Sequence, residues 1–276
     1  MDNLNLHELS KKVREDGYEA EYADAKLCQD IILLLISKSK YINNVTIKGG
    51  VVMHSISNSA RRATLDIDFD FINYSMSDES IKSFITDLNG IYGLKIKIVG
   101  KPEELMHQDY EGKRVHLIIE DHFNNILQSK IDVGVHKHLS IKQEEYCFNL
   151  SFDADGATLF INSKEQIFVE KLKSILKFSS LSTRFKDVYD MHYLLPIIDK
   201  EVLLNDIDIL IFNDDTMREN NIEEIIKRIK STFDDKRYLR RLSSSNKNWT
   251  DASNDLVLKE IIQFLSDLKM MEIVKE

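Results

Sequence analysis

The chain has 276 residues, enough for one large domain or for two modest ones with hydrophobic cores of their own. Apolar residues make up 43% and charged residues 30%, which excludes a disordered chain. The net charge of −9 does not indicate a general nucleic-acid binder, so any phosphate binding would need a local basic cluster.

Helices and strands alternate in the first part of the chain. Leu27, Ile31 and Leu34 recur at helical spacing, and Ser77 is a candidate helix N-cap. Glycine and proline within 100–102 are expected to end a strand. In chain order, we predict a mainly helical segment (4–40), a strand (45–47), a helix (51–57), a strand (64–71), a helix (78–88) and three strands (94–99, 113–120 and 127–135), the last two joined by a loop (121–125).

After about residue 160 the apolar residues follow a helical rhythm, which Pro196 interrupts. Helices are predicted at 165–176, 188–195, 201–211, 222–233 and 254–272. The predicted fold class is therefore α+β. A mixed sheet with flanking helices occupies residues 1–160, and an α-helical C-terminal domain occupies residues 161–276.

Three features of the chain point to the cytoplasm. Cys28 and Cys147 lack C-x-x-C spacing, so neither a disulfide framework nor a zinc site is expected. Residues 1–15 are polar and charged, so no signal peptide is expected. The longest apolar run, residues 31–36, is too short to cross a bilayer, and no membrane partner is expected.

Acidic and apolar residues alternate along the strand predicted at 64–71. Asp66 and Asp68 therefore share one face, roughly 6.5 Å apart along the strand. Two such carboxylates can hold Mg²⁺ between the phosphates of an NTP. A solvated edge-strand face is the alternative, although Asp is depleted in strands. We favour the metal site for Asp66 and Asp68, and we expect Asp70 to be solvated or to cap a helix.

The segment Lys48-Gly49-Gly50 lies between a predicted strand and a predicted helix. Glycine lets the backbone approach a phosphate closely, and the helix N-terminus behind it offers free N–H groups. The alternative is an ordinary tight turn between the strand and the helix.

Asp132 lies on another predicted strand, on the face opposite its apolar neighbours. A third carboxylate from a neighbouring strand would complete a two-metal site or act as base on the attacking hydroxyl. His136 and His138 follow, and we interpret them as surface or phosphate-contacting residues, because histidine prefers other metals to Mg²⁺.

Charged residues also gather on the helices predicted after residue 160. Glu170 and Lys171 lie on one helix, and Arg184, Asp187 and Asp190 follow at spacings of three, near one face of the next. Lys171 and Arg184 could meet triphosphate charge, while Asp187 or Asp190 orients a cation or the base. The alternative is an intrahelical salt-bridge ladder, which contributes little.

These pieces, in this order, resemble the nucleotidyltransferase AbiEii/AbiGii toxin family of the polymerase-β-like nucleotidyltransferase superfamily. The resemblance covers roughly residues 45–195. The matching motifs are Lys48-Gly49-Gly50, Arg62-Ala63-Thr64-Leu65-Asp66-Ile67-Asp68, Lys130-Ile131-Asp132, Glu170-Lys171-Leu172 and Arg184-Phe185-Lys186-Asp187-Val188-Tyr189-Asp190. The family often has Arg before the first Asp of the last motif, where this chain has Lys186, and the superfamily more usually has Gly-Ser where this chain has Gly49-Gly50.

The resemblance implies a polymerase-β-like fold and transfer of NMP from an NTP to an acceptor hydroxyl, with release of pyrophosphate and with Mg²⁺ (or Mn²⁺) as cofactor. It implies the toxin of a bacterial toxin–antitoxin (abortive infection) system, acting on tRNA, with an antitoxin encoded nearby. The implied catalytic residues are Asp66, Asp68, Asp132, Lys171 and Asp187, with Asp66, Asp68 and Asp132 as metal ligands. The implied nucleotide-binding residues are Lys48, Gly49, Gly50, Arg62, Thr64, Lys171, Arg184 and Asp190.

The sequence alone does not identify the molecule that accepts the NMP group. A locally basic stretch contains Lys227, Arg228, Lys230, Lys236, Arg237, Arg240, Arg241 and Lys247. It could bind RNA, with Tyr238 and Trp249 stacking on exposed bases, or it could be an ordinary solvated helix face. Arg61 and Arg62 are a second candidate contact for the nucleotide or the RNA end. Transfer to a small molecule or a protein, and a non-enzymatic binding module that kept the fold, are the competing functions.

Overall fold

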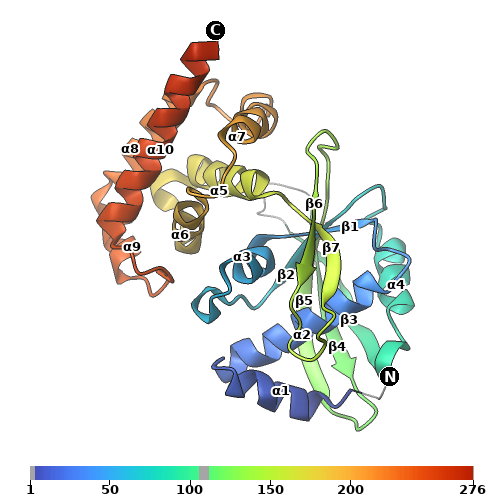
Figure 1. Ribbon diagram of the computed structural model, residues 1–276. Coiled ribbons are helices and arrows are strands. Elements are labelled where there is room, and N and C mark those ends of the chain that lie inside the picture. Colours follow the sequence, from blue (N-terminus) through green and yellow to red (C-terminus); the bar gives the residue numbers. More distant parts are fainter. Residues whose placement is uncertain (1–3, 106–111, 276) are drawn as a thin grey trace. The chain divides into compact units, whose positions relative to one another are not determined.

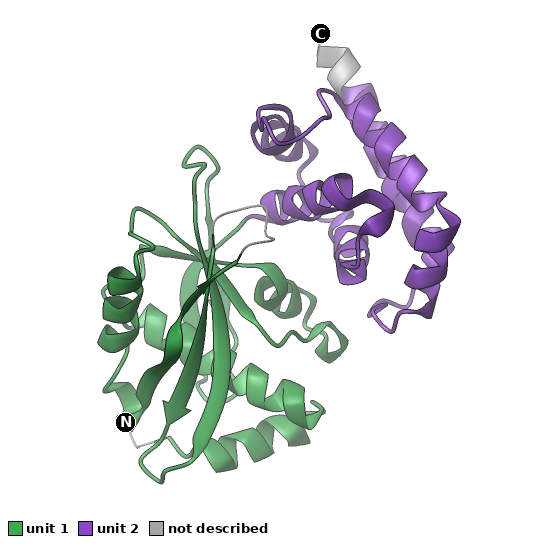
Figure 2. Cartoon of the chain, turned by 180° about the vertical axis from the view of Figure 1, so that it is seen from behind, with its two compact units in different colours: residues 1–162 green, residues 163–276 purple. Residues whose placement is uncertain are grey.

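The computed structural model describes residues 4–105 and 112–275, and the chain forms two compact units, residues 1–162 and 163–276 (Figures 1 and 2). The first unit is a mixed sheet with flanking helices and the second is helical, which confirms the predicted α+β class.

Two helices of the first unit, α1 and α4, begin where a short polar side chain caps their free backbone amides. Asn5 accepts from the amides of His7 and Glu8 at the start of α1, and Ser77 accepts from Ser80 at the start of α4, as predicted. The helices are α1 (Leu6–Glu15), α2 (Ala20–Ser37), α3 (Gly49–Ser57) and α4 (Asp78–Asp87), with 3₁₀ turns η1 (Ala60–Arg62) and η2 (Ile91–Gly93).

Within the described residues, the sheet has seven strands in the order β3-β4-β5-β2-β1-β7-β6. The strands are β1 (Val45–Lys48), β2 (Ile67–Phe71), β3 (Lys95–Glu104), β4 (Lys113–Glu120), β5 (Ile126–Val135), β6 (Glu144–Phe148) and β7 (Ala157–Ile161). The pairs β2–β5 and β1–β7 are parallel, and the other pairs are antiparallel. This order places β2 between β5 and β1 at the centre of the sheet (Figure 1).

The apolar face of β2 is fixed by aromatic packing. Phe69 and Phe71 are fully buried, and their ring centroids lie 5.7 and 5.2 Å from that of Phe84 on α4. Because side chains alternate along a strand, this packing directs the intervening acidic residues to the other face. The hydrophobic pattern therefore sets the register of β2 and with it the place of the carboxylates.

Several predicted boundaries were wrong. The strand predicted at 64–71 begins at Ile67, so Asp66 lies just before it. The strand predicted to stop near Gly100 continues through a bulge, where Gly100 takes a φ of +77°. β6 and β7 were not predicted, since each has only a five-residue pattern. The helix α9 (Lys236–Ser244) was also missed, because only two of its residues are buried.

The helices of the second unit pack on one another, with α5 buried along most of its length. α5 contacts α6 and α7, and α10 contacts α6 and α8. The remaining elements of this unit are α5 (Lys164–Phe178), η3 (Ser179–Leu181), α6 (Phe185–Leu194), α7 (Lys200–Ile207), the π-helical segment η4 (Asp208–Phe212), α8 (Ile222–Phe233) and α10 (Asn254–Lys275). Across the described part of the chain, no helix is both long and apolar enough to cross a membrane.

One carboxylate in this helical unit is buried at a cost. Asp206 on α7 is 1% exposed, and among the described residues its Oδ2 has no hydrogen-bond partner. Burial, reinforced by the charge of Glu165 and opposed by a hydrogen bond from Asn205, raises the pKa of Asp206 from 3.8 to about 6. The folded protein therefore holds a proton between these pH values that the unfolded chain has released. Its free energy of unfolding falls as pH rises through this window.

We predict that Asp206→Asn raises the free energy of unfolding at pH 7.5 by about 1–2 kcal/mol, because the buried charge is gone. The gain shrinks toward pH 4, where the native carboxyl is already neutral. Urea unfolding followed by circular dichroism at both pH values measures it. Asp208→Asn, one residue past α7 and exposed, is the control. An equal gain at both pH values would contradict a titrating Asp206.

Candidate active site

A row of charged residues crosses four neighbouring strands at the centre of the sheet. Arg114 on β4 lies opposite Asp132 on β5, Asp132 lies opposite Asp68 on β2, and Asp68 lies opposite Lys48 at the end of β1. Directly opposed residues project on the same face with Cβ atoms about 5 Å apart. The register therefore brings together two of the predicted carboxylates, Asp68 and Asp132, and flanks them with basic side chains.

The third predicted carboxylate, Asp66, is close to the same row. Its Oδ1 lies 2.8 Å from Nζ of Lys130, which is two residues before Asp132 on β5. Within the described residues, however, no cluster of three or more His, Cys, Asp or Glu side chains is close enough to hold a metal ion. Asp66, Asp68 and Asp132 thus occupy one region of the sheet without converging on a single point.

Arg114 is a site residue that the sequence analysis missed. Its Nε and Nη2 lie 2.8 and 2.6 Å from the two carboxylate oxygens of Asp132, a bidentate pair across two strands. This hydrogen bonding raises the pKa of Arg114 above its ordinary value. The signal was present, since counting back from the loop predicted at 121–125 places Arg114 opposite Asp132 in the hairpin.

Lys48 does not project freely from the glycine turn. Its Nζ lies 2.6 Å from Oδ1 of Asp70, and both side chains are buried, at 7% and 8% exposure. The expectation that Asp70 would be solvated or cap a helix is therefore wrong. Lys48 lies opposite Asp68, and its long side chain reaches the next carboxylate along the same face of β2.

The two glycines make room for the acidic segment. Gly49 has a φ of +66°, and a Cβ added there would lie 2.6 Å from Oδ2 of Asp68. A Cβ at Gly50 would lie 2.7 Å from Oγ1 of Thr64. The motif around Lys48 is therefore more than a turn, because it lets the start of α3 pack directly against the residues that carry the carboxylates.

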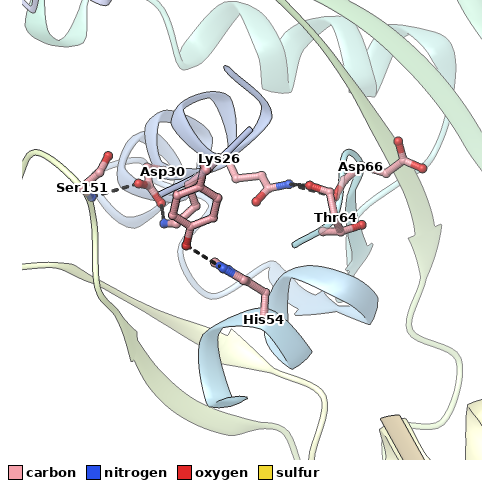
Figure 3. Close-up of polar contacts among 8 residues, drawn as sticks. Lys26, Asp30, His54, Thr64, Asp66 and Ser151 are labelled. Atoms are coloured by element: carbon pink, nitrogen blue, oxygen red, sulfur yellow. Dashed lines mark hydrogen bonds and ion pairs between the residues drawn. The ribbon is translucent and has the colours of Figure 1, made fainter. Parts of the chain in front are cut away.

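A buried polar network behind this segment holds its backbone (Figure 3). The side-chain amide of Gln29, on α2, donates to the carbonyl of Thr64 at 2.8 Å and approaches that of Asp66 at 3.4 Å. One residue further along α2, Asp30 pairs with Lys26 and accepts from the backbone amide of Ser151. Side chains of α2 thus form hydrogen bonds with backbone groups that do not belong to a strand, and this fixes the position of Asp66.

His54 and Arg62 are two further polar residues that are buried in this region. His54 hydrogen-bonds to the hydroxyl of Tyr18 at 2.8 Å, and burial, with the nearby charges of Lys26 and Arg62, lowers the pKa of His54 to about 4. Arg62, predicted to contact the nucleotide, is only 3% exposed, whereas Arg61 beside it is exposed.

In the helical unit, Lys171 lies at the centre of a second charged cluster. Its Nζ lies 3.0 Å from Oδ1 of Asp187 and 2.7 Å from Oδ2 of Asp190. Asp190 is fully buried and also accepts a hydrogen bond from Nε1 of Trp249 at 2.9 Å. Asp187 keeps 16% exposure. The pattern predicted as an alternative, a ladder within one helix, is wrong, because Lys171 joins α5 to α6.

The other residues proposed to contact the nucleotide or RNA differ in exposure. Arg184 is exposed at the start of α6. Tyr238 and Trp249 are buried, at 1% and 6% exposure, so of the two alternatives the one in which they stack on RNA bases is wrong. The burial of Tyr238 follows from the amphipathic pattern of α9, which leaves Lys236, Arg237 and Arg240 exposed. His136 is buried as well, which corrects its expected surface position, whereas His138 is exposed.

Comparison with known protein families assigns the chain to one of them. Residues 31–205 match the family described as nucleotidyl transferase AbiEii toxin, type IV TA system. The chain belongs to the AbiEii family. It is therefore a nucleotidyltransferase of a toxin family, and membership implies an NTP substrate and a cognate antitoxin. All the predicted site residues, and Arg114, lie within the matched range.

The other comparisons add little to the AbiEii assignment. No curated protein matches the chain. Among solved structures, an antigenic nucleotidyltransferase-like protein from Paracoccidioides brasiliensis shares 12% identity with a TM-score of 0.46, covering 74% of this chain and 93% of that chain.

We predict that Gly49→Ala lowers the free energy of unfolding by about 1–3 kcal/mol, because it adds backbone strain and a clash with Asp68. Two controls separate these effects. Gly17→Ala has the strain alone, since φ is +96° with nothing within 4 Å of the added Cβ, and Gly50→Ala has the close approach alone. Urea unfolding should place Gly49→Ala below both. An effect no larger than that of Gly17→Ala would contradict the packing of Gly49 on Asp68.

Proposed function

We propose that this AbiEii protein moves NMP from an NTP to an acceptor hydroxyl with release of pyrophosphate, and that the reaction needs Mg²⁺ or Mn²⁺. The observation that carries the proposal is the register of β2 and β5. It sets Asp68 beside Asp132 while the glycine turn packs on Asp68. An acidic pair next to a glycine turn and a helix N-terminus suits a nucleotide whose phosphates reach the N–H groups of α3.

The carboxylates fit a divalent cation by their chemistry. Mg²⁺ and Mn²⁺ take hard oxygen ligands, and Asp66, Asp68 and Asp132 offer only these. We propose Asp66 and Asp68 as the main ligands and Asp132 as a further ligand or as the base that accepts the proton of the attacking hydroxyl. A bound cation would supply charge neutralisation of the triphosphate.

Other residues have roles that follow from where they lie. We propose that Gly49 and Gly50 bind phosphate through their backbone, and that Thr64 shapes that turn. Lys48 and Arg62 support the site from the interior, since both side chains are buried. These roles differ from direct nucleotide contact through a charged head group.

In the helical unit, we propose that Lys171 and Asp187 contribute to catalysis and that exposed Arg184 contacts phosphate. Asp190 is better suited to positioning Lys171, because its carboxylate is buried between Lys171 and Trp249. A lysine held by two carboxylates has a fixed direction, which a charge that stabilises departing pyrophosphate needs.

For the acceptor, we propose tRNA, and we propose a cytoplasmic location. Exposed basic residues on and near α9 support an RNA surface based on phosphate contacts rather than base stacking; they are Lys227, Lys230, Lys236, Arg237, Arg240 and Lys247. Both cysteines are free, which is consistent with a reducing compartment.

We predict that Asp66→Asn and Asp68→Asn each lower NMP transfer to tRNA by about 10²–10³-fold, since each removes a charge that the transition state needs. The assay incubates the protein with Mg²⁺, total tRNA and each α-³²P-NTP in turn. Glu120→Gln, which breaks only a surface pair with Lys97, is the control and keeps wild-type activity.

The acceptor fraction decides between the competing functions. Label on tRNA that disappears in both variants supports the proposal. Label on protein or on a small molecule instead would replace tRNA as the acceptor. Absence of label from every acceptor, with circular dichroism showing a folded protein, would contradict NMP transfer as the function.

A second prediction concerns the lysine of α5. Lys171→Met should lower kcat for transfer by about 10²-fold, with a smaller change in KM, if it stabilises charge that develops in the reaction. Lys173→Met, two residues along the same helix, breaks the pair with Asp214 and leaves kcat unchanged. Equal losses in the two variants would show that the helix needs its ion pairs for folding only. Asp190→Asn should lower kcat by less than Lys171→Met.

A further inference from the structure

Two basic side chains are paired with carboxylates that the proposed function assigns to the metal. Arg114 holds Asp132 through two hydrogen bonds, and Lys130 holds Asp66 through one ion pair. Both come from the strands β4 and β5, and both lie on the sheet face that carries Asp68. The negative charge of Asp66 and Asp132 is therefore compensated by side chains of the protein itself.

The exposure of these pairs differs from that of a purely structural pair. The side chains of Lys48 and Asp70 are both below 10% exposure, so neither can leave without uncovering the other. Asp132 is 3% exposed while Arg114 is 29% exposed, and Lys130 and Asp66 are each about one third exposed. Arg114 and Lys130 can therefore swing toward solvent while the carboxylates stay in place.

Charge balance favours an exchange. Together Arg114 and Lys130 bring two positive charges to the carboxylates, and one divalent ion brings the same. A divalent ion bound by Asp66 and Asp68, with Asp132 as a further ligand, would leave the local charge unchanged and release a guanidinium and an ammonium group at the surface of the site. The guanidinium fork matches phosphate oxygens in two-point contact, and a lysine binds phosphate as a point charge.

We propose that Arg114 and Lys130 are exchangeable counter-cations that hold Asp132 and Asp66 in the ligand-free protein and bind the polyphosphate of the nucleotide once a divalent ion takes those carboxylates. The inference rests on the proposed function. It adds two nucleotide-contacting residues, and it gives a role to the basic partners of the proposed metal-binding carboxylates. It also predicts that each residue opposes metal binding and favours nucleotide binding.

The test measures both equilibria on the intact protein. Binding of Mn²⁺ alone is followed by the electron paramagnetic resonance of free Mn²⁺. Binding of inorganic tripolyphosphate, the part shared by all NTPs, is followed by calorimetry in excess Mg²⁺. The variants are Lys130→Gln and Arg114→Gln, and Lys97→Gln, which breaks the exposed cross-strand pair with Glu120, is the matched control.

Each of the two variants should bind Mn²⁺ about threefold to tenfold more tightly than wild type and tripolyphosphate at least about threefold more weakly, while Lys97→Gln changes neither. Arg114→Lys keeps the charge but loses the fork, so it should stay near wild type for Mn²⁺ and still weaken tripolyphosphate. Damage to the fold would weaken both ligands together, so the opposite signs identify the exchange.

Two results would overturn the inference: Mn²⁺ affinity that is unchanged or lower in both variants, or tripolyphosphate affinity that does not fall. If wild type transfers NMP normally while either result holds, the inference alone has failed. If wild type neither binds Mn²⁺ at Asp66, judged against Asp66→Asn, nor transfers NMP, the proposed function has failed as well.

Discussion

The first unit depends on how it neutralises carboxylates on the polar face of an otherwise apolar sheet. Asp70 and Asp132 are almost fully buried, and an unpaired charge there would be strongly destabilising. The neighbouring strands supply the compensating positive charges, because β1 ends in Lys48 and β4 carries Arg114. Along the strand order β4-β5-β2-β1, two acidic strands therefore lie between two strands that carry basic residues.

The same constraint accounts for the glycine turn and for the packing of α2. A carboxylate at Asp68 leaves room for a helix start only if no side chain stands between them, and Gly49 meets that condition. The residues just before β2 lack a strand partner, so Gln29 supplies hydrogen bonds to their carbonyls. Site geometry and fold stability are therefore consequences of the same contacts, which is why substitutions at Gly49 test both.

The local sequence pattern predicted most of the helices and strands. It did not predict which strands and side chains pair when they are far apart in the chain. Alternation placed Asp66, Asp68 and Asp132 on strands or beside them, and the aromatic residues fixed their face. No local signal shows that β2 pairs with β5 and β1, because these strands are far apart in the chain. The partner of Asp70 was missed for that reason. Trp249 was misjudged similarly, since its partner Asp190 lies on α6, far from Trp249 in the chain.

Ion pairs of different exposure do different work in this chain. The pair of Lys48 and Asp70 is closed to solvent and fixes two strands. Lys171 joins two helices through Asp187 and Asp190, and Asp187 keeps 16% exposure. The pairs of Arg114 and Lys130 leave the basic partner partly in solvent, so this partner can move outward when another cation neutralises the carboxylate. Selection for folding alone would not require that difference. A site that must stay neutral when empty, and still accept both a divalent ion and a polyphosphate, would.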